Sequence, residues 1–468
     1  TMITALSNRS VFRRSKSIVV IILVGFILSA SCAHSQRSIL DDYIIQAIGQ
    51  SPEIHQSNLE LQKAGISRDF AANCRLPTVG FQLGYQTAHG GRNIDLPIGD
   101  MLNGVYSTLN QITGTPSFPM LENQRINFLP SNFYDAKIQT TIPIYNPEVR
   151  HNIDLSENKI VSANLDIRIR KRDLAFRVKS AYFDYLMAVE AVKIYRQALS
   201  LAQESRRVNE RLLKNGKGLP AYVIRSDAEI ESISADISGA EMRVQNSASM
   251  FNYLLNRPEN SPIDTMFDAK VALDAGRLLA TLPPDISRRE EIKNLQNASV
   301  LYKNVIKIHK SAALPRLNGI INVGSQAENW QFDSQSRYFL LGLQLEVPIF
   351  SAFKVRQKTA IAQLELGQNE SRTEYASRGL SLAAGVAINN LRSALESLDA
   401  SQKQLEAAST YRRLIEKGYA EGVSTFIETI DARNQWTTAQ LAQKIRLYKV
   451  LQAVAAVERE TASYNIDQ

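Results

Sequence analysis

Four segments of the chain alternate apolar and polar residues with a period of two, which predicts β-strands with one apolar and one polar face. The clearest of them places its apolar residues on one side: Phe339, Leu341, Leu343, Leu345 and Val347. The other three segments begin near Pro77, Tyr134 and Leu317. Each segment is about ten residues long, and this length and period are typical of strands in outer-membrane barrels.

Between the strand pairs the apolar period changes to that of long helices. In the first such region, small, apolar and aromatic residues step alternately by four and three positions: Leu174, Val178, Ala181, Tyr185, Ala188, Val192, Tyr195, Leu199 and Ala202. This heptad seam predicts coiled-coil packing. A helix of about seventy residues is expected after the last strand, and at 1.5 Å per residue it would be roughly 105 Å long. No globular domain accommodates such a helix.

The order of strands and helices occurs twice. Ile-Pro-Ile-Tyr around Pro143 ends one alternating run, and Val-Pro-Ile-Phe around Pro348 ends another. Gly218 follows Pro143 by 75 residues, and Gly422 follows Pro348 by 74 residues. A spacing kept over so long a stretch indicates duplication of an element of fixed length. The chain is therefore expected to form two long helical hairpins that turn at these glycines.

The expected fold class is mostly α with a small β part, made of two coiled-coil hairpins and four transmembrane strands per chain. The expected boundaries are a signal peptide 1–35, an N-terminal helix 36–75, a first strand pair 76–146 with a long loop 88–132, a first periplasmic hairpin 147–256, an irregular patch 257–284, an ascending helix 285–313, a second strand pair 314–348, and a second periplasmic hairpin with the C-terminal segment 349–468. The long loop is expected outside the cell, where outer-membrane barrels carry their longer loops.

The N-terminus has the pattern of a secretory signal, because Arg9, Arg13, Arg14 and Lys16 precede the apolar run Ile18–Leu28. This run is shorter than the about 20 apolar residues that a membrane-spanning helix needs. The signal-peptide interpretation is therefore favoured, and an uncleaved N-terminal anchor is the alternative.

Two cleavage sites compete. Ala33-His34-Ser35 before Gln36 fits ordinary signal cleavage, and the alternative is lipid modification of Cys32 as the first residue. Ordinary cleavage is favoured, since Ser29 stands where lipoprotein sites usually carry Leu. It leaves Cys74 as the single thiol, which excludes a disulfide framework. It also lowers the formal charge from +8 to +4, too small an excess for a nucleic-acid-binding protein.

The strand count constrains the assembly. Four strands cannot close a barrel, and open sheet edges are not tolerated in lipid, so the chain is expected to oligomerise. A dimer would supply eight strands, whose interior fills with side chains, whereas a trimer would supply twelve strands and could leave a lumen. The alternative is a soluble sandwich attached to a coiled coil.

This ordered, duplicated set of strand pairs, Pro-Ile-Tyr or Pro-Ile-Phe corners, long helices and turn glycines resembles the TolC-like outer-membrane efflux protein family over nearly the whole mature chain. The resemblance implies a homotrimer with a twelve-stranded barrel in the outer membrane of a Gram-negative bacterium, surrounded by outer-membrane lipid. It implies an α-helical tunnel through the periplasm. It also implies two partners at the far tip of that tunnel, an inner-membrane pump and a periplasmic adaptor protein.

The family closes the tunnel tip with acidic side chains just past the turn glycine of the second hairpin. The matching residues are Glu428 and Asp431, and the first hairpin offers Asp227. Three copies would form rings of like charge, which favour cations and raise each other's carboxylate pKa values. The alternative is that they are ordinary acids of a helix surface. Leu219 and Val423 lie where relatives present an apolar turn to adaptors, or they simply pack the turn.

No arrangement of residues predicts an enzyme, a metal site or a cofactor site. The five histidines have no metal-ligand spacing, and no phosphate-binding glycine loop joins a strand to a helix. The expected function is a passive exit duct of a tripartite efflux or type I secretion system. The alternatives are a structural or adhesive coiled-coil protein of the envelope, and the periplasmic adaptor itself, which would need one hairpin instead of two.

Overall fold

The computed structural model of the protein describes residues 38–129 and 131–467, so the expected signal peptide and Cys32 lie outside the described residues. Most of the described chain is helical and a smaller part is β, which confirms the predicted fold class at that level. Within these two ranges, no helix combines the length and the apolar character that crossing a bilayer requires.

The contacts within the chain divide it into two units. We call the first the helical unit; it comprises the described residues up to Asn58 together with Asp166–Ile292 and Ala376 onward. We call the second the sheet unit; it comprises Leu59–Leu165 and Lys293–Tyr375.

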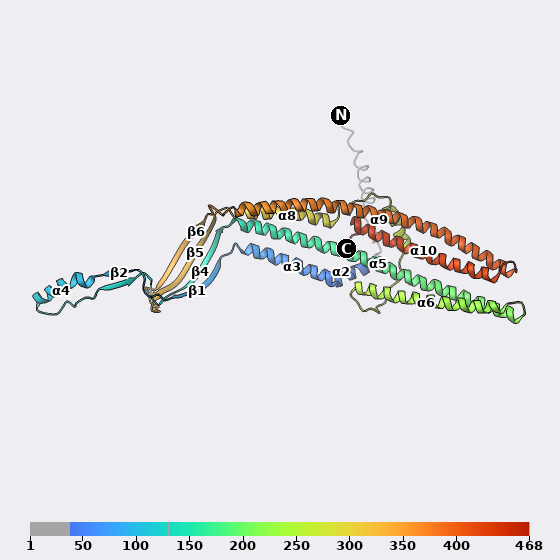
Figure 1. The fold of residues 1–468 in the computed structure, drawn as a ribbon, viewed down its shortest axis with the longest axis horizontal. Helices are drawn as coiled ribbons and strands as arrows, with labels where there is room; N and C mark the ends of the chain where they lie inside the picture. Colours follow the sequence, from blue (N-terminus) through green and yellow to red (C-terminus); the bar gives the residue numbers. More distant parts are fainter. Residues whose placement is uncertain (1–37, 130, 468) are drawn as a thin grey trace, which may run out of the picture. The chain divides into compact units, whose positions relative to one another are not determined.

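Two pairs of long helices form the hairpins. Helix α5 (Pro147–Lys214) turns into α6 (Pro220–Leu254), and α9 (Lys354–Ala420) turns into α10 (Phe426–Thr461). In the helical unit the two members of each pair lie side by side (Figure 1). The shorter helices are α2 (Ile39–Gln50), α3 (Pro52–Asn73), α4 (Ile98–Thr113), α7 (Ala269–Leu279) and α8 (Glu290–Ser311).

The heptad seam of α5 lies in the core of the helical unit. Its buried members are Leu174, Val178, Ala181, Ala188, Val192 and Ala202. Helices α2, α6 and α10 pack against the first part of this seam and contribute the buried side chains of Ile44, Phe251 and Leu451. Burial of each such side chain stabilises the fold by about 1.5–3 kcal/mol. The seam predicted from the sequence therefore joins elements that are distant along the chain.

The sheet unit holds a four-stranded antiparallel sheet in the order β1-β4-β5-β6 (Figure 1). Its strands are β1 (Thr78–Gln86), β4 (Phe133–Tyr145), β5 (Arg316–Glu328) and β6 (Arg337–Glu346). The register aligns the apolar positions into continuous rows, for example Phe81, Ile138, Val323 and Phe339. All four side chains of this row are exposed. On the same face, Leu343 of the edge strand β6 retains 74% of its accessible surface. The sheet therefore has the apolar face that the alternation predicts.

The opposite face of the sheet is polar. The Lys137 ammonium donates a hydrogen bond of 2.8 Å to the Asp135 carboxylate, and the Tyr338 hydroxyl donates one of 2.9 Å to the same carboxylate. Asp135 and Lys137 lie on β4 and Tyr338 lies on β6, so the Tyr338–Asp135 hydrogen bond crosses over β5. One side of the sheet thus suits lipid, and the other suits water.

Both outer strands of the sheet have one unpaired side within the described chain, because β1 pairs only with β4 and β6 pairs only with β5. The three successive antiparallel pairings make β1 and β6 run in opposite directions. Strand β6 of one copy could therefore pair with β1 of another in the antiparallel manner that the rest of the sheet uses.

Two segments expected to be irregular contain regular structure. The segment 88–132, expected to be a long loop, holds a two-stranded sheet of β2 (Asn93–Leu96) and β3 (Gln124–Asn127) as well as α4. The patch 257–284 holds α7. This helix forms because it packs closely on α10, so that a Cβ atom at Gly276 would lie 2.6 Å from a methyl carbon of Val454. The helix also has local signals, since its sequence is amphipathic and the Asp268 carboxylate accepts a 2.9 Å hydrogen bond from the Lys270 amide as an N-cap; packing on α10 stabilises so short a helix.

Candidate functional site: two hairpin turns and a two-faced sheet

Each hairpin turns at a glycine in the left-handed conformation. Gly422 has φ +81°, and the Val423 amide donates a 2.8 Å hydrogen bond to the Gly418 carbonyl. In the first hairpin the same role falls to Gly216, with φ +70°, and not to Gly218. Gly218 is needed for another reason, because a Cβ atom there would lie 2.7 Å from the backbone nitrogen of Leu213. The spacing of the repeat therefore predicts both turns. In the first hairpin, however, it points to Gly218, whereas the glycine in the left-handed conformation is Gly216.

The apolar residues beside the turns are exposed. Leu219 retains 56% of its accessible surface and Val423 retains 82%, so neither packs its own turn. Ile224 and Ile427, at the starts of the return helices, are also exposed. Each hairpin turn in this chain thus presents apolar side chains to its surroundings, a feature typical of protein-interaction sites.

Glu428 has a local structural role. It is the third residue of α10, and its carboxylate accepts a 2.6 Å hydrogen bond from the Thr425 backbone amide, while the Thr425 hydroxyl caps the Glu428 amide. This reciprocal arrangement is a capping box, which fixes the start of the helix. Asp431 lies one turn further on, is exposed, and accepts a 2.8 Å bond from the Gln435 side chain. Both carboxylates remain at the surface of the chain.

Asp227 lies in a different environment. It forms an ion pair with Arg206 of α5, and Arg206 also contacts Glu210 at 2.8 Å. The hydrogen bond from Arg206 to Asp227 raises the pKa of that guanidinium. Asp227 is therefore neutralised within its own hairpin, unlike Glu428 and Asp431.

The structure brings the two hairpins together near their turns, in part through Tyr222 and Phe426, which each follow the repeat glycine of their hairpin by four positions. The rings of Tyr222 and Phe426 lie 5.0 Å apart, and the Tyr419 hydroxyl donates a 3.0 Å hydrogen bond to Asn209. Further along, Glu229 of α6 faces Arg433 of α10 at 3.8 Å. These contacts join residues more than 200 positions apart, so the contacts themselves are visible only in the fold.

The Glu229–Arg433 pair is buried, and its hydrogen bonding is incomplete. The side chains are 8% and 10% exposed, and neither the Glu229 Oε2 atom nor the Arg433 Nη2 atom has a hydrogen-bond partner. Burial raises the pKa of Glu229 above the ordinary value, and the positive charges of Arg433 and Arg225 oppose this only in part. Separation of the hairpins would return both charges to water. The pair is thus an electrostatic contact that favours separation when Glu229 is ionised.

The corners between sheet and helices carry Pro143 and Pro348. Pro143 lies at the end of β4, beside a register shift in its pairing with β5, and Pro348 follows β6 ahead of α9. Aromatic residues gather at this end of the sheet: Tyr145, Phe350 and Phe353. A second group lies at the opposite end: Tyr85, Tyr134, Trp330 and Phe332, with the Trp330 ring stacked on both tyrosines at 5.5 and 5.3 Å. Two aromatic bands around an apolar face are typical of strands that cross an outer membrane.

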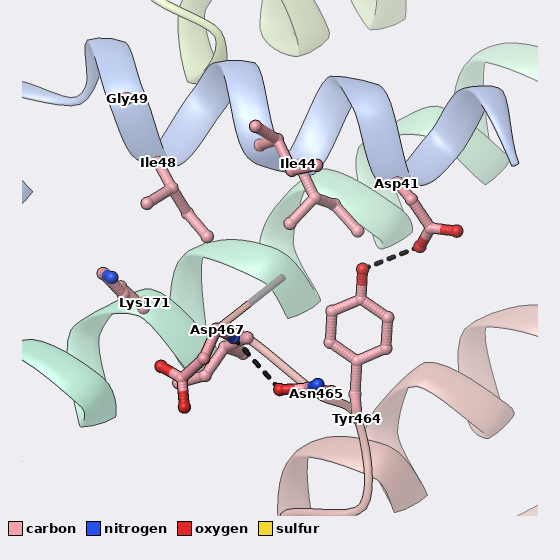
Figure 2. Close-up of a pocket in the computed structure, with 10 residues that line it drawn as sticks. Asp41, Ile44, Ile48, Gly49, Lys171, Tyr464, Asn465 and Asp467 are labelled. Carbon is pink, nitrogen blue, oxygen red and sulfur yellow. Dashed lines mark hydrogen bonds between the residues drawn. The ribbon is translucent and has the colours of Figure 1, made fainter. Parts of the chain in front are cut away.

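A shallow hollow of about 370 Å³ lies between α2 and the residues that follow α10 (Figure 2). The Tyr464 hydroxyl donates a 2.7 Å hydrogen bond to Asp41, and Ile44 and Ile48 line the upper wall. Burial and the bond to Asp41 raise the pKa of Tyr464, which keeps it protonated and suits a packing role. Among the described residues there is no group of three or more His, Cys, Asp or Glu side chains placed to hold a metal ion.

A two-faced sheet with aromatic bands, joined in one chain to long helical hairpins, is characteristic of channel proteins of the bacterial outer membrane. The sequence profile of the outer membrane efflux protein family matches residues 43–256 and 287–462. These ranges hold both hairpins and all four strands of the sheet β1-β4-β5-β6. The chain belongs to this family.

Similar proteins cover most of the chain. Outer membrane protein TolC of Escherichia coli strain K12 is 20% identical over 431 residues, which are 88% of this chain and 79% of TolC. The pyoverdine export outer membrane protein OpmQ of Pseudomonas putida is 22% identical over 337 residues, 69% of this chain and 71% of OpmQ. The open state of the Neisseria gonorrhoeae MtrE outer membrane channel shares the fold, with a TM-score of 0.67 at 17% identity over 90% of this chain and 88% of MtrE.

The family comprises outer-membrane channels for efflux, not enzymes, and the exit-duct function and outer-membrane localisation predicted from the sequence are confirmed. The protein is an outer-membrane exit duct of a Gram-negative bacterium. Family membership favours this function over both the adhesive coiled-coil interpretation and the periplasmic adaptor interpretation.

Replacement of Glu229 by Gln should raise the melting temperature relative to the wild type more at about pH 8 than at about pH 5. A carboxyl whose pKa is raised in the folded state contributes stability that is fully present below its unfolded pKa of about 4.3 and is lost as the pH rises through the raised value. Gln cannot ionise and escapes this loss. Melting of the two detergent-solubilised proteins at both pH values gives the comparison. Glu231→Gln, at an exposed position of the same helix, is the control. A Glu229→Gln difference that does not change with pH would contradict the account.

Proposed function

We propose that three copies of the chain close their sheets into a twelve-stranded barrel. The unpaired sides of β1 and β6 support this, because a sheet edge exposed to lipid leaves backbone N–H and C=O groups without partners. Three copies supply twelve strands, enough for a lumen, whereas eight strands enclose only side chains. The polar face, with Lys137, Asp135 and Tyr338, would line that lumen, and the exposed apolar face would meet lipid.

The strand lengths fit a barrel that crosses the outer membrane. Strands β1 and β6 have 9 and 10 residues, and β4 and β5 have 13 each. About 9–11 residues tilted by about 45° span the apolar part of a bilayer, and the longer central strands would extend beyond it. The two aromatic bands would lie at the two membrane interfaces.

The long helices would continue the duct into the periplasm. Helix α5 has 68 residues and α9 has 67, so each is about 100 Å long. In a trimer, the two hairpins of each chain would contribute to a tunnel that continues the barrel. The conduit would be passive: an inner-membrane pump would supply the energy, and a periplasmic adaptor would join the pump to the hairpin turns. The names of relatives such as OpmQ, an export protein, support a partnership of this kind.

The gate would lie at the turn of the second hairpin. Glu428 and Asp431 are exposed and have no cationic partner among the ion pairs of the described residues, whereas Asp227 is paired with Arg206. Three copies of each free carboxylate around one axis would repel one another and attract cations. Asp227 would act differently, by bracing the first hairpin. Glu428 would have two roles, as a capping residue and as a charged ring.

The proposed gate is tested by planar-bilayer conductance of the Glu428→Gln/Asp431→Asn variant. Gln at the third helical position also satisfies a capping box, so this variant removes charge and keeps the helix start. Cation selectivity should fall by at least about twofold, because the variant lacks the carboxylates that attract cations into the pore. Glu428→Ala would additionally lose the capping-box bond to the Thr425 amide and destabilise the start of α10.

The control is Glu241→Gln, which removes one acid of α6 far from the turn, where Glu241 pairs with Arg196. Its conductance and selectivity should equal those of the wild type. Unchanged selectivity in the double variant would remove Glu428 and Asp431 from the gate and leave the duct intact. No conductance from any inserted protein would contradict the duct itself.

Docking of the adaptor at the turns is tested by photo-crosslinking in the native host. A photoreactive amino acid at Val423, which is 82% exposed, should give a covalent product with a periplasmic protein that carries a helical hairpin. The same amino acid at Leu278, which is 65% exposed and lies on α7, is the matched control. Equal products from both positions, or none from Val423, would argue against docking at this turn.

A further inference from the structure

Helix α4, within the segment that joins β1 to β4, has an apolar face without a partner. Residues on this face step alternately by three and four positions: Ile98, Met101, Val105, Thr108 and Ile112. We call this row the α4 seam. Met101 is 72% exposed, Val105 is 55% exposed and Ile112 is 76% exposed. Steps of three and four are the spacing of a coiled-coil seam, which requires a facing helix.

The other face of α4 is fixed by its own chain. The Asn103 side chain makes two hydrogen bonds with the backbone of Leu121, of 2.9 and 2.7 Å, and the Asn110 side chain makes two with the backbone of Phe118, of 2.8 and 3.0 Å. Gly99 completes the contact, because a Cβ atom there would lie 2.3 Å from the Leu121 carbonyl oxygen. The helix therefore cannot turn its apolar seam toward the segment that covers it.

The residue types of α4 indicate whether its seam binds a membrane surface or another copy of α4. Helices that bind a membrane surface carry Lys and Arg on the polar face, and α4 contains neither. Its one charged residue, Asp100, lies off the seam and accepts a 2.8 Å hydrogen bond from Asn123. An uncharged seam meets a copy of itself without repulsion between like charges. Ile98 and Ile112 occupy equivalent heptad positions, and symmetric packing of such seams is the usual way in which they are buried.

We propose that the α4 seams of three copies pack together as a short three-helix bundle at the end of the barrel that faces the outside of the cell. This inference rests on the proposed trimer, since a common axis is what places three identical segments beside one another. The segment follows directly after β1, the edge strand that would join one copy to the next. The bundle would tie the three outer segments together and narrow the mouth of the duct.

The test is crosslinking of an Ile112→Cys variant on a Cys74→Ser background with a trifunctional maleimide. Ile112 lies on the seam, so three chains should join into one product. Thr113→Cys, at an exposed position beside it and off the seam, is the matched control and should give at least about fivefold less product. Addition of Val105→Glu to Ile112→Cys places like charges in the bundle and should reduce the product to the level of the control.

The oligomeric state is measured on the same samples by native mass spectrometry. A trimer without the three-chain product, or with equal product from Thr113→Cys, would overturn the α4 bundle and leave the proposed duct standing. Absence of a trimer would overturn both. The alternative partner of the seam is the membrane surface, and a fluorophore attached to the Ile112→Cys variant tests it. Quenching of this fluorophore by spin-labelled lipid would place the seam on the membrane surface and contradict the bundle.

Discussion

The unpaired backbone at the two edges of the amphipathic sheet is the constraint on which the rest of the protein depends. The four strands present a continuous apolar face, with Phe81, Ile138, Val323 and Phe339 in one row, and that face is exposed in a single chain. Lipid would cover the face but could not satisfy the N–H and C=O groups of β1 and β6. Closure by further copies, as proposed, would satisfy them. Both a wet interior and a symmetric placement of the helices would follow from that closure.

The hairpin turns are stabilised in a way that is compatible with opening. Aromatic packing of Tyr222 on Phe426 and the bond from Tyr419 to Asn209 hold the two hairpins of one chain together. The buried pair of Glu229 and Arg433 works against them, because the Glu229 Oε2 atom and the Arg433 Nη2 atom have no hydrogen-bond partner, although the Arg433 guanidinium also donates bonds of 3.3 Å to the Thr429 and Leu201 carbonyls. The contact thus combines favourable packing with a costly charge pair. Such a contact suits the proposed passive duct, which its partners would open.

Much of this fold follows from sequence, and the exceptions have physical causes. Alternation predicted both faces of the sheet, and the heptad seam through Val178 predicted the helical core, because in each case the period of the apolar residues sets the buried face. Helix α4 was missed although its apolar residues step by three and four positions from Ile98 to Ile112, because the glycines, prolines and asparagines around it favoured a loop. Helix α7 was also missed; it has 11 residues and packs on α10. The repeat located the turns, but the role of Gly216 depends on a backbone angle, and the Glu229–Arg433 contact depends on tertiary packing. Glu428 was identified through the family resemblance, and its second role, in the capping box with Thr425, has a sequence pattern that was not used, Thr425 followed three positions later by Glu428.

The most direct test of the central claim is disulfide trapping between β1 and β6. Within one chain these strands are separated by two others, about 14 Å, which is beyond the reach of a disulfide. Cysteines would be placed at Gln82 and, one variant at a time, at Leu340, Gly342 and Gln344 on a Cys74→Ser background. The account predicts that at least one register gives products of two and three linked chains and none larger. Absence of linkage in every register, or a ladder that continues beyond three chains, would contradict closure of the sheet by a trimer.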